Sequence, residues 1–492
     1  MTSRPHLYLA LADLLTQALR EGRYRPGDRL PSVRDLCDAH GMSLATVTHA
    51  LHRLEDAGWI ESRPRRGFFV LTSGDSPPRQ APPGSAPALQ LEERRQRLMA
   101  QAATRDGLVS LGHLALPPAL LPLAALRQLV AACLRTQVAT LAAGSVFGSQ
   151  ALREQLAGRL GRTGVRADPE DVVLTHGDGE SLQLCLSLLT QDGDCVAVAS
   201  PGSLRVLEVV TALGLHPLEL PAPSTGGDMV AAMAAFLVQA RPTVCVIDLG
   251  LLATAAGPMS DAQKQALVEL LRAHRVTAIE FDLMGALHRG TERARPLKSF
   301  DADDVVIYCS SLACITGPGF SLGYVVSARH RLRLRAARTV HGELIPRMTD
   351  DVLAEFLSGN GFDTHLRRLR LRLRQQVAAW TRAVKQHFPP GTSVSAGEAG
   401  YTLWVTLPGN LATSDLLAQA QAHGYTFVPG AVFSPTGRFD QCLRLTAAHP
   451  LDATRLAGLK LLGEAARQML TQGQSSPRST LCATPSLPPS AG

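Results

Sequence analysis

Lysine is scarce in this 492-residue sequence, and several familiar patterns are missing from it. There are four lysines, Lys264, Lys298, Lys385 and Lys460, so arginine supplies almost all of the positive charge. No run of 18 apolar residues occurs, which argues against a membrane-spanning helix. The N-terminus, MTSRPHLYLALADLL, lacks the basic and apolar regions of a signal peptide. We therefore expect a cytoplasmic protein with no membrane partner.

The nine cysteines are scattered, without a C-x-x-C pair or a Cys/His cluster at zinc spacing. We interpret them as reduced and mostly buried thiols, and we predict no metal site. The net charge of +7 is weak support for nucleic-acid binding by itself. The position of the charge along the chain is more informative.

The length and the 45% hydrophobic content predict two or three domains with buried cores. Residues 72–105 form a predicted linker, which is rich in Pro, Gly, Ser and Ala up to residue 90 and helical beyond it. Over 106–470, short strands such as CVAVAS and VCVIDL alternate with helical patterns, which predicts an α/β domain with a mainly parallel sheet. Residues 471–492 have the composition of a disordered tail.

Residues 1–71 have the pattern of a winged helix-turn-helix. A helical segment over 5–21 precedes two helices that Ser32 and Ser43 are placed to cap, and Gly41 ends the first of them. The strand-like pieces WIES and GFFVL then flank a basic turn. An alternative interpretation is a small helical protein-interaction domain with a solvated basic loop.

The side chains placed to contact DNA lie on the two helices and in the wing turn. Small polar groups at a helix start can enter a major groove and reach phosphates or base edges. A glycine in the wing lets the backbone approach a phosphate or the minor groove. The predicted DNA-binding residues are Arg34, Ser43, Thr46, Thr48, His49, Arg63, Arg66 and Gly67.

The segment GRYRPGDRLPSVRDLCDAHGMSLATVTHALHRLEDAGWIESRPRRGFFV resembles the DNA-binding domain of GntR-type regulators along its whole length. The matching pieces, in order, are PGDRLPSVRDL, the GMS-xx-TV helix start and LEDAGWIESRPRRGFFV. The resemblance implies a homodimer that binds paired half-sites of double-stranded DNA through Arg34, residues 43–49 and Arg66-Gly67. Leu44 stands where many relatives have a basic residue, so their base specificity is not carried over.

Residues 106–470 resemble the fold-type I aminotransferases. The landmarks include VVLTHGDGESLQLCLSLL, DGDCVAVASPGS, PGFSLGYVVSARH, GYTLWVTLP and FVPGAVFS. Fused behind a GntR-type module through a long linker, this is the layout of the MocR-type regulators. The resemblance implies a multidomain chain, in which a winged helix-turn-helix (α+β) precedes an α/β aminotransferase-like domain. It also implies a small C-terminal α+β subdomain over about 375–470 and pyridoxal phosphate as the family cofactor.

Pyridoxal phosphate chemistry needs a lysine for the Schiff base, a carboxylate at the pyridine nitrogen, a partner for the ring oxygen, and donors with positive charge for the phosphate. The sequence departs from the family at all of these groups. The replacing residues are Cys314 at the lysine, Phe281 at the pyridine-binding aspartate, Met284 at the tyrosine near the ring oxygen, Thr254 at the asparagine of N-P-x-G, Asp178 in the phosphate cradle, Ser203 at the stacking aromatic and Ser321 at the phosphate-binding arginine.

One landmark residue remains, Arg444 in LRLTAA, as a candidate to bind a carboxylate ligand. Its alternative role is a structural salt bridge in the small subdomain. Changes such as Phe281 and Met284 run toward apolar groups, so we expect the old cavity to be filled or to accept an uncharged ligand. Asp282 points away from Phe281 if the segment is a strand. Lys298, the lysine nearest to the altered loop, lies in a stretch that is typical of a surface.

We therefore predict a DNA-binding transcription regulator that is not an enzyme and has no covalently bound cofactor. Its large domain dimerises and senses a small-molecule effector, such as an amino acid or another carboxylate. Two alternatives stay open. One is a pyridoxal-phosphate-binding regulator or aminotransferase with an atypical site, and the other is an architectural DNA-binding dimer with no effector.

Overall fold

The computed structural model describes residues 11–12, 14–16, 18, 24, 28–56, 60–63, 67–70, 86–103, 107–136, 138–221, 228–341, 343–409 and 411–475. The chain divides into two units, residues 1–89 and 90–492. In the part of the chain that is described, no helix has the length and apolar character needed to cross a membrane.

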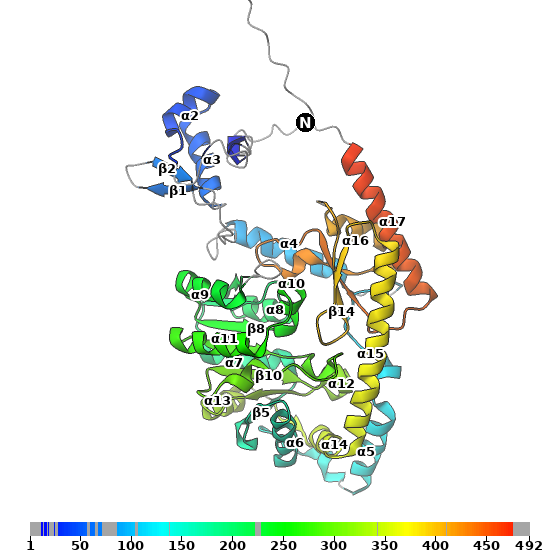
Figure 1. The fold of residues 1–492 in the computed structure, drawn as a ribbon. Coiled ribbons are helices and arrows are strands. Elements are labelled where there is room, and N and C mark those ends of the chain that lie inside the picture. Colours follow the sequence, from blue (N-terminus) through cyan, green and yellow to red (C-terminus); the bar gives the residue numbers. More distant parts are fainter. Residues whose placement is uncertain are drawn as a thin grey trace, which may run out of the picture. The chain divides into compact units, whose positions relative to one another are not determined.

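Helix α2 of the first unit shows the predicted cap (Figure 1). It spans Val33–His40 and begins after Ser32, whose Oγ accepts a hydrogen bond from the Asp35 amide at 3.3 Å. The Asp35 carboxylate in turn accepts from the Ser32 amide at 3.0 Å, which completes a capping box. Gly41 ends the helix in the left-handed region at φ 61°, a conformation that glycine adopts without steric cost.

A second helix and a hairpin complete the first unit. Helix α3 (Leu44–Asp56) is followed by strands β1 (Ile60–Arg63) and β2 (Gly67–Val70), which pair antiparallel. Apolar side chains of both helices and of the hairpin meet the described part of the 11–18 segment in one core. This is the predicted winged helix-turn-helix.

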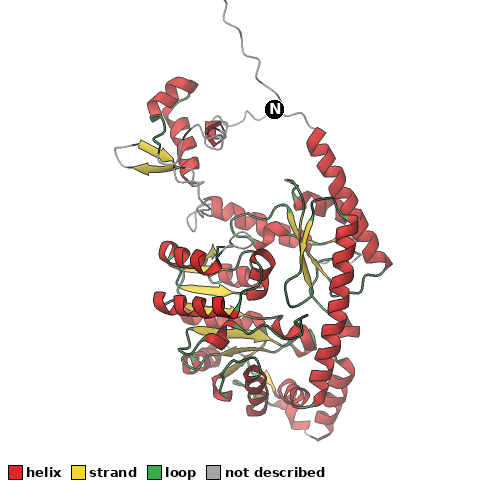
Figure 2. Cartoon of the chain, in the orientation of Figure 1, coloured by secondary structure: helices red, strands yellow, loops and turns green. Residues whose placement is uncertain are grey.

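A seven-stranded sheet forms the centre of the second unit (Figures 1 and 2). The strand order is β5-β11-β10-β9-β8-β6-β7, and β11 alone runs antiparallel to its two neighbours. The sheet is therefore mainly parallel, as predicted. The strands are β5 (Val172–Thr175), β6 (Cys195–Val198), β7 (His216–Glu219), β8 (Val244–Ile247), β9 (Thr277–Phe281), β10 (Val306–Ser311) and β11 (Gly323–Val326).

Helices cover both faces of this sheet, and alternate strand residues point to opposite cores. Val196 and Val198 pack toward one core and the intervening Ala197 toward the other. The first core also receives side chains of α7, α8 and α13, and the second receives those of α9 and α11. The helices of this part are α5 (Leu123–Thr136), α6 (Gln150–Gly161), α7 (Asp178–Leu189), α8 (Leu204–Ala212), α9 (Met229–Ala240), α10 (Leu249–Ala256), α11 (Asp261–His274), α12 (Ala313–Thr316), α13 (Arg331–His341) and α14 (Arg347–Ser358).

The small subdomain has a four-stranded sheet of order β13-β14-β17-β16 and is α+β, as predicted. It is larger than the predicted 375–470, because the long helix α15 starts at Asn360 and a segment near residue 109 pairs with β15. Its elements are β3 (Val109–Ser110), α15 (Asn360–His387), β13 (Ser393–Ser395), β14 (Thr402–Thr406), α16 (Thr413–Ala422), β15 (Tyr425–Thr426), β16 (Val428–Pro429), β17 (Cys442–Thr446) and α17 (Ala453–Ser475).

Two predicted boundaries need correction. Helix α17 continues to Ser475, so the start of the predicted tail at residue 471 is too early, and residues 476–492 lie outside the described part. In the predicted linker, residues 72–85 are likewise outside it, whereas helix α4 spans Ala86–Ala102. Most of α4 belongs to the second unit, because Arg94 pairs with Asp440 at 2.8 Å.

Candidate functional site

The start of α3 carries most of the predicted DNA-contacting side chains. Ser43 Oγ accepts a hydrogen bond from the Thr46 amide at 3.3 Å, and the two hydroxyls lie 2.8 Å apart, so Ser43 caps the helix as predicted. Ser43 and His49 are exposed, and Thr46 and Thr48 are half-buried. Arg34 is exposed on α2. These positions leave the polar start of α3 accessible to a ligand.

A further arginine, Arg29, lies beside the wing. Arg63 and Gly67 face each other at the end of the hairpin, and Gly67 has φ 100°, which favours glycine. A Cβ at Gly67 would lie 3.2 Å from the Arg29 Nε, so the Arg29 guanidinium lies against the wing. Residues 64–66, including the predicted Arg66, are outside the described residues. Sequence reasoning did not single out Arg29, because its proximity to the wing comes from its bridge to Phe69.

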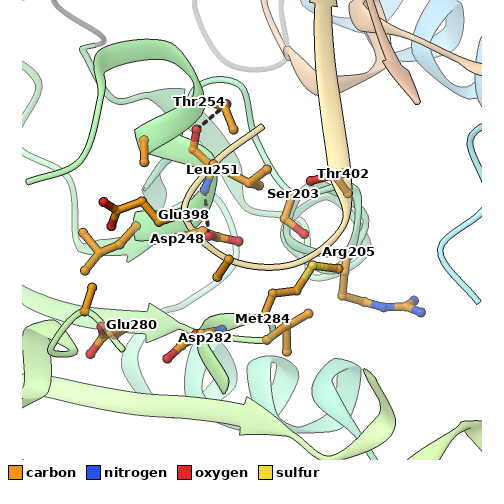
Figure 3. Close-up of a pocket in the computed structure, with 18 of the residues that line it drawn as sticks. Ser203, Arg205, Asp248, Leu251, Thr254, Glu280, Asp282, Met284, Glu398 and Thr402 are labelled. Atoms are coloured by element: carbon orange, nitrogen blue, oxygen red, sulfur yellow. Dashed lines mark hydrogen bonds between the residues drawn. The ribbon is translucent and has the colours of Figure 1, made fainter. Parts of the chain in front are cut away.

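The second unit contains a cavity of about 400 Å³ at the carboxyl ends of β8 and β9 (Figure 3). Asp248 directly follows β8, and Asp282 directly follows β9. The start of α8, helix α10 and the small subdomain supply the other walls. The carboxyl edge of a parallel sheet is the usual ligand site in such folds, and this volume suits a small molecule. Of the two expectations for this cavity, that it is filled is therefore wrong, and that it accepts an uncharged ligand stays a prediction.

The replaced cofactor positions divide between the cavity and the core. Four of them line the cavity together with Arg444, namely Asp178, Ser203, Thr254 and Met284. The remaining three, Cys314, Phe281 and Ser321, are not among its lining residues. Ser203 lies beside the cavity in Figure 3, so a small hydroxyl stands where the family has an aromatic ring. This replacement helps to keep the cavity open.

Cys314 lies in the short helix α12 after β10 and is half-buried. Burial raises the pKa of its thiol to about 12, and the negative charge of Asp178 raises it further. A hydrogen bond with Tyr401 lowers the pKa but does not offset these two effects. The thiol is therefore protonated at neutral pH, and a thiol in this form is a poor nucleophile. At the position predicted to replace the lysine, Cys314 is thus a small side chain without nucleophilic character.

Phe281 and Asp282 point in opposite directions, as the strand alternation predicts. Phe281 is fully buried and packs in the core that contains Cys185 and Cys309. Asp282 instead lines the cavity, where it pairs with Arg293 and accepts a hydrogen bond from Tyr308 Oη at 3.0 Å. At the position predicted to replace the pyridine-binding aspartate, an aromatic ring therefore lies in the core, and the neighbouring carboxylate is already paired.

An acidic side chain, Asp178, lies at the turn that the sequence predicts as the phosphate-binding loop. Asp178 is the first residue of α7, where the positive end of the helix dipole attracts negative charge. Its carboxylate also pairs with Arg205 Nε at 3.5 Å. A Cβ at Gly177 would lie 3.2 Å from Ser321 Oγ, so a neutral hydroxyl faces the same turn. A bound phosphate would have to displace or repel the Asp178 carboxylate.

The N-P-x-G position has become part of a helix. Helix α10 begins after Asp248, whose Oδ1 accepts from the Leu251 amide at 3.0 Å. The Thr254 hydroxyl donates to the Leu251 carbonyl at 2.6 Å, so this proton is used inside the helix. The hydrogen bond that an asparagine would offer to the cofactor ring is therefore replaced by a local helical contact.

These residues do not fit a covalently bound pyridoxal phosphate, and the lysines do not change this conclusion. Lys298 is buried and pairs with Asp301 at 2.9 Å and with Asp304, so the expected surface position is wrong. Lys264 is the one lysine among the lining residues of the cavity. Its Nζ donates to the Arg295 carbonyl at 2.8 Å, and burial lowers its pKa.

Two carboxyl groups at the cavity wall have raised pKa values. Burial raises the pKa of Asp248 to about 7, and the charge of Asp282 adds to the rise, whereas the Leu251 and Gly250 amides oppose it. Burial also raises the pKa of Glu280 to about 7, although its carboxylate accepts hydrogen bonds from the amides of Leu297 and Lys298 at 2.7 and 2.8 Å. This wall of the cavity is therefore acidic.

Arg444 supplies a cation on another wall. Its Nη2 donates to the Gly112 carbonyl at 3.2 Å, and its guanidinium lies 5.0 Å from the centre of the Phe433 ring. Burial lowers its pKa to about 10, and its Nε has no hydrogen-bond partner among the described residues. Within the same residues no carboxylate forms a salt bridge with it. The alternative role as a structural salt bridge therefore has no partner there.

Comparison with known proteins places both units in one family. Residues 7–70 match the family described as "Bacterial regulatory proteins, gntR family". The chain is 30% identical over 470 residues to the uncharacterized HTH-type transcriptional regulator YjiR of Escherichia coli, which covers 93% of this chain and 98% of that protein. The chain belongs to the MocR-type GntR regulators. The HTH-type transcriptional regulator TauR of Rhodobacter capsulatus is 26% identical over 443 residues, covering 87% of this regulator and 90% of TauR.

Solved structures resemble the second unit of this MocR-type regulator. The kynurenine aminotransferase of Pyrococcus horikoshii superposes with a TM-score of 0.68 at 22% identity, over 78% of this chain and 97% of that one. The alpha-aminoadipate aminotransferase LysN of Thermus thermophilus gives 0.67 at 23% identity, over 77% and 99%. At these identities the likeness shows the fold, so the fold-type I assignment is confirmed.

The raised pKa of Asp248 leads to a prediction about stability. A carboxyl group whose pKa is higher in the folded than in the unfolded state contributes stability below its unfolded pKa, and this contribution is lost as the pH rises to about 7. Asp248→Asn removes the ionisation and keeps a helix-capping oxygen. Its free energy of unfolding should therefore exceed that of the wild type by an amount that grows between pH 4 and 7, on the order of 1–4 kcal/mol.

Denaturant unfolding of the full-length proteins, followed by circular dichroism at each pH, measures the difference in the free energy of unfolding between Asp248→Asn and the wild type. The exposed Asp192, changed to Asn, is the matched control and should show no such growth. A difference between Asp248→Asn and the wild type that stays constant from pH 4 to 8 would contradict the assignment.

Proposed function

We propose that this regulator binds double-stranded DNA as a homodimer and responds to a small molecule that it holds without a covalent bond, and that it has no aminotransferase activity. One observation carries the proposal. A cavity of about 400 Å³ lies in the aminotransferase-like unit, and the sequence predicts Cys314 at the position of the family's Schiff-base lysine. The open cavity can hold a ligand, whereas aminotransferase chemistry requires a lysine amine at the position where we predict Cys314.

Loss of the cofactor is supported by four independent replacements. The Cys314 thiol is protonated at neutral pH, Phe281 is part of the core, and Thr254 is bonded within α10. Asp178 supplies negative charge where a phosphate would lie. Each change removes a different interaction, so a single compensating residue cannot restore the site. These contacts favour the proposal over an aminotransferase with an atypical site.

The effector is proposed to be an amino acid or another carboxylate. Arg444 has a buried guanidinium that faces the cavity and has no carboxylate partner in the described part of the chain. Arginine binds carboxylates through two parallel hydrogen bonds, and such charge-assisted pairs are strong when solvent is excluded. An architectural dimer without an effector would have no use for this arrangement, so the cavity favours effector binding.

Dimerisation is supported by exposed apolar residues at one edge of the second unit. Strands β4 (Gly144–Ser145) and β12 (Ile345–Pro346) pair there. Leu141, Val340 and Leu344 lie close to these strands in sequence and are 63%, 75% and 55% exposed. Large apolar side chains gathered on a surface often mark an interface. We propose that these residues contribute to the homodimer.

One prediction from this proposal concerns the cofactor. After incubation with pyridoxal phosphate and reduction with borohydride, the protein should show neither a 330–430 nm absorption band nor a lysine adduct in peptide mass spectra. A lysine lies in the cavity at Lys264, so Lys264→Met is the matched control for any adduct that does form. An adduct present in the wild type and absent from Lys264→Met would overturn the proposed loss of covalent binding.

A second prediction concerns DNA. Arg34→Ala and Arg66→Ala should each weaken binding to a duplex selected from random sequence by the wild-type protein. The dependence of log K on log salt should become flatter by about one unit for each phosphate that the variant no longer neutralises. Fluorescence anisotropy at several salt concentrations measures both effects. Arg272→Ala, which removes an exposed arginine of the second unit, should bind like the wild type, and unchanged affinity in both test variants would refute the docking.

A third prediction concerns the dimer. Leu344→Glu places a charge among the exposed apolar residues, so it should shift the protein from dimer toward monomer in sedimentation velocity. Val238→Glu introduces the same change at an equally exposed position, on α9, and should leave the dimer intact. A dimer in both variants would exclude this edge as the interface.

A further inference from the structure

Several charged side chains around the cavity form ion pairs with one another, so a charged side chain without an ion pair is a candidate to bind a ligand. Arg205 pairs with Asp178 and Glu208, and Asp282 pairs with Arg293. The partners of the other charged groups differ in kind. Glu280 is held by two backbone amides. Lys264 lies near Asp261, as does Arg295, and Glu398 acts electrostatically on Lys264.

Asp248 differs from Glu280 and Glu398 in its surroundings. Glu280 is buried and Glu398 is exposed to solvent, whereas Asp248 is half-buried at the cavity wall. In the described residues no lysine, arginine or histidine pairs with it, and one oxygen is used to cap α10. The group is half-buried, and the charge that acts on it, that of Asp282, is also negative. Burying a carboxylate without a counter-ion is costly. The arrangement therefore leaves room for a cation that the protein itself does not supply.

The position of Asp248 makes it accessible from the cavity. In Figure 3 its carboxylate lies near the middle of the labelled side chains, between Ser203 and Asp282. Apolar side chains, Leu251 and Met284 among them, line the cavity around it. Arg444 belongs to the same cavity and lacks a carboxylate. One cavity thus contains an acidic group and a cationic group, neither of which forms an ion pair in the described residues.

We propose that Asp248 binds an organic cation, so that the effector carries a protonated amine at the Asp248 wall and a carboxylate at Arg444. This inference rests on the proposed function, since it concerns the same cavity. The amine stays protonated and unmodified, because the Asp248 carboxylate accepts its hydrogen bond and amino-acid side chains supply no aldehyde or ketone with which an imine could form. In the described residues no group of three or more His, Cys, Asp or Glu side chains could hold a metal ion, which favours an organic cation.

The test uses matched straight-chain compounds of four to eight carbons: acids, amines and ω-amino acids. Calorimetric titration of the full-length protein measures each affinity. Asp248→Asn should lower the affinity for the amines and the amino acids by tenfold or more, because a charge-assisted hydrogen bond is lost. The affinity for the acids should not change. Arg444→Gln should lower the affinity for the acids and the amino acids and leave the affinity for the amines unchanged. The amino acids should bind more tightly than either single-function series.

Two controls keep the result interpretable. Asp248→Asn retains a capping oxygen for α10, and its unfolding transition shows whether it folds. Glu208→Gln removes another carboxylate of the cavity wall that already has a partner in Arg205, so it should bind all three series like the wild type.

The outcomes separate this inference from the proposed function. If the acids bind through Arg444 but the amines fail to bind, or bind Asp248→Asn as tightly as the wild type, the cation site is wrong and the effector cavity stands. If none of the three series binds the wild type, both are wrong.

Discussion

The ion pair between Asp282 and Arg293 fixes the floor of the cavity, and much of the surrounding geometry depends on it. Both side chains are 18% exposed, and Asp282 also accepts from Tyr308 Oη and from the Gly285 amide at 2.7 Å. These contacts hold the end of β9 to β10 and turn Phe281 into the core. Removing one member of such a desolvated pair leaves an uncompensated charge, at a cost of about 3–5 kcal/mol.

Local contacts like these would let the fold persist if its chemistry is lost, as we propose. Phe281 packs in the core, and Asp178 supplies the negative charge that a helix N-terminus attracts. The sheet and its helices therefore gain local substitutes for contacts that a bound cofactor would provide. The interactions that stabilise this fold need no bound cofactor, so the fold by itself does not specify a reaction.

Much of the architecture could be predicted from sequence, because periodicity and capping are local. Ser32, Gly41 and the short apolar strands have the expected structures. Burial and pairing depend on residues far apart in sequence, and there prediction failed. Lys298 lies in a polar stretch yet is enclosed by Asp301 and Asp304. The open cavity and the unpaired Asp248 were likewise not predictable, since no local pattern says which charges meet.

The unpaired charges also bear on how a ligand could act. A half-buried carboxylate and a half-buried guanidinium without ion-pair partners each lower the stability of the empty unit. A ligand that satisfies both removes these costs, so the free energy of unfolding rises as it binds. An effector controls DNA affinity only if it binds two conformations of the protein differently. Since α10 begins at Asp248 and Arg444 belongs to the small subdomain, one ligand would connect two separate walls. A conformation that moves those walls apart would break one of the two interactions, and this difference in affinity is the physical basis that regulation requires.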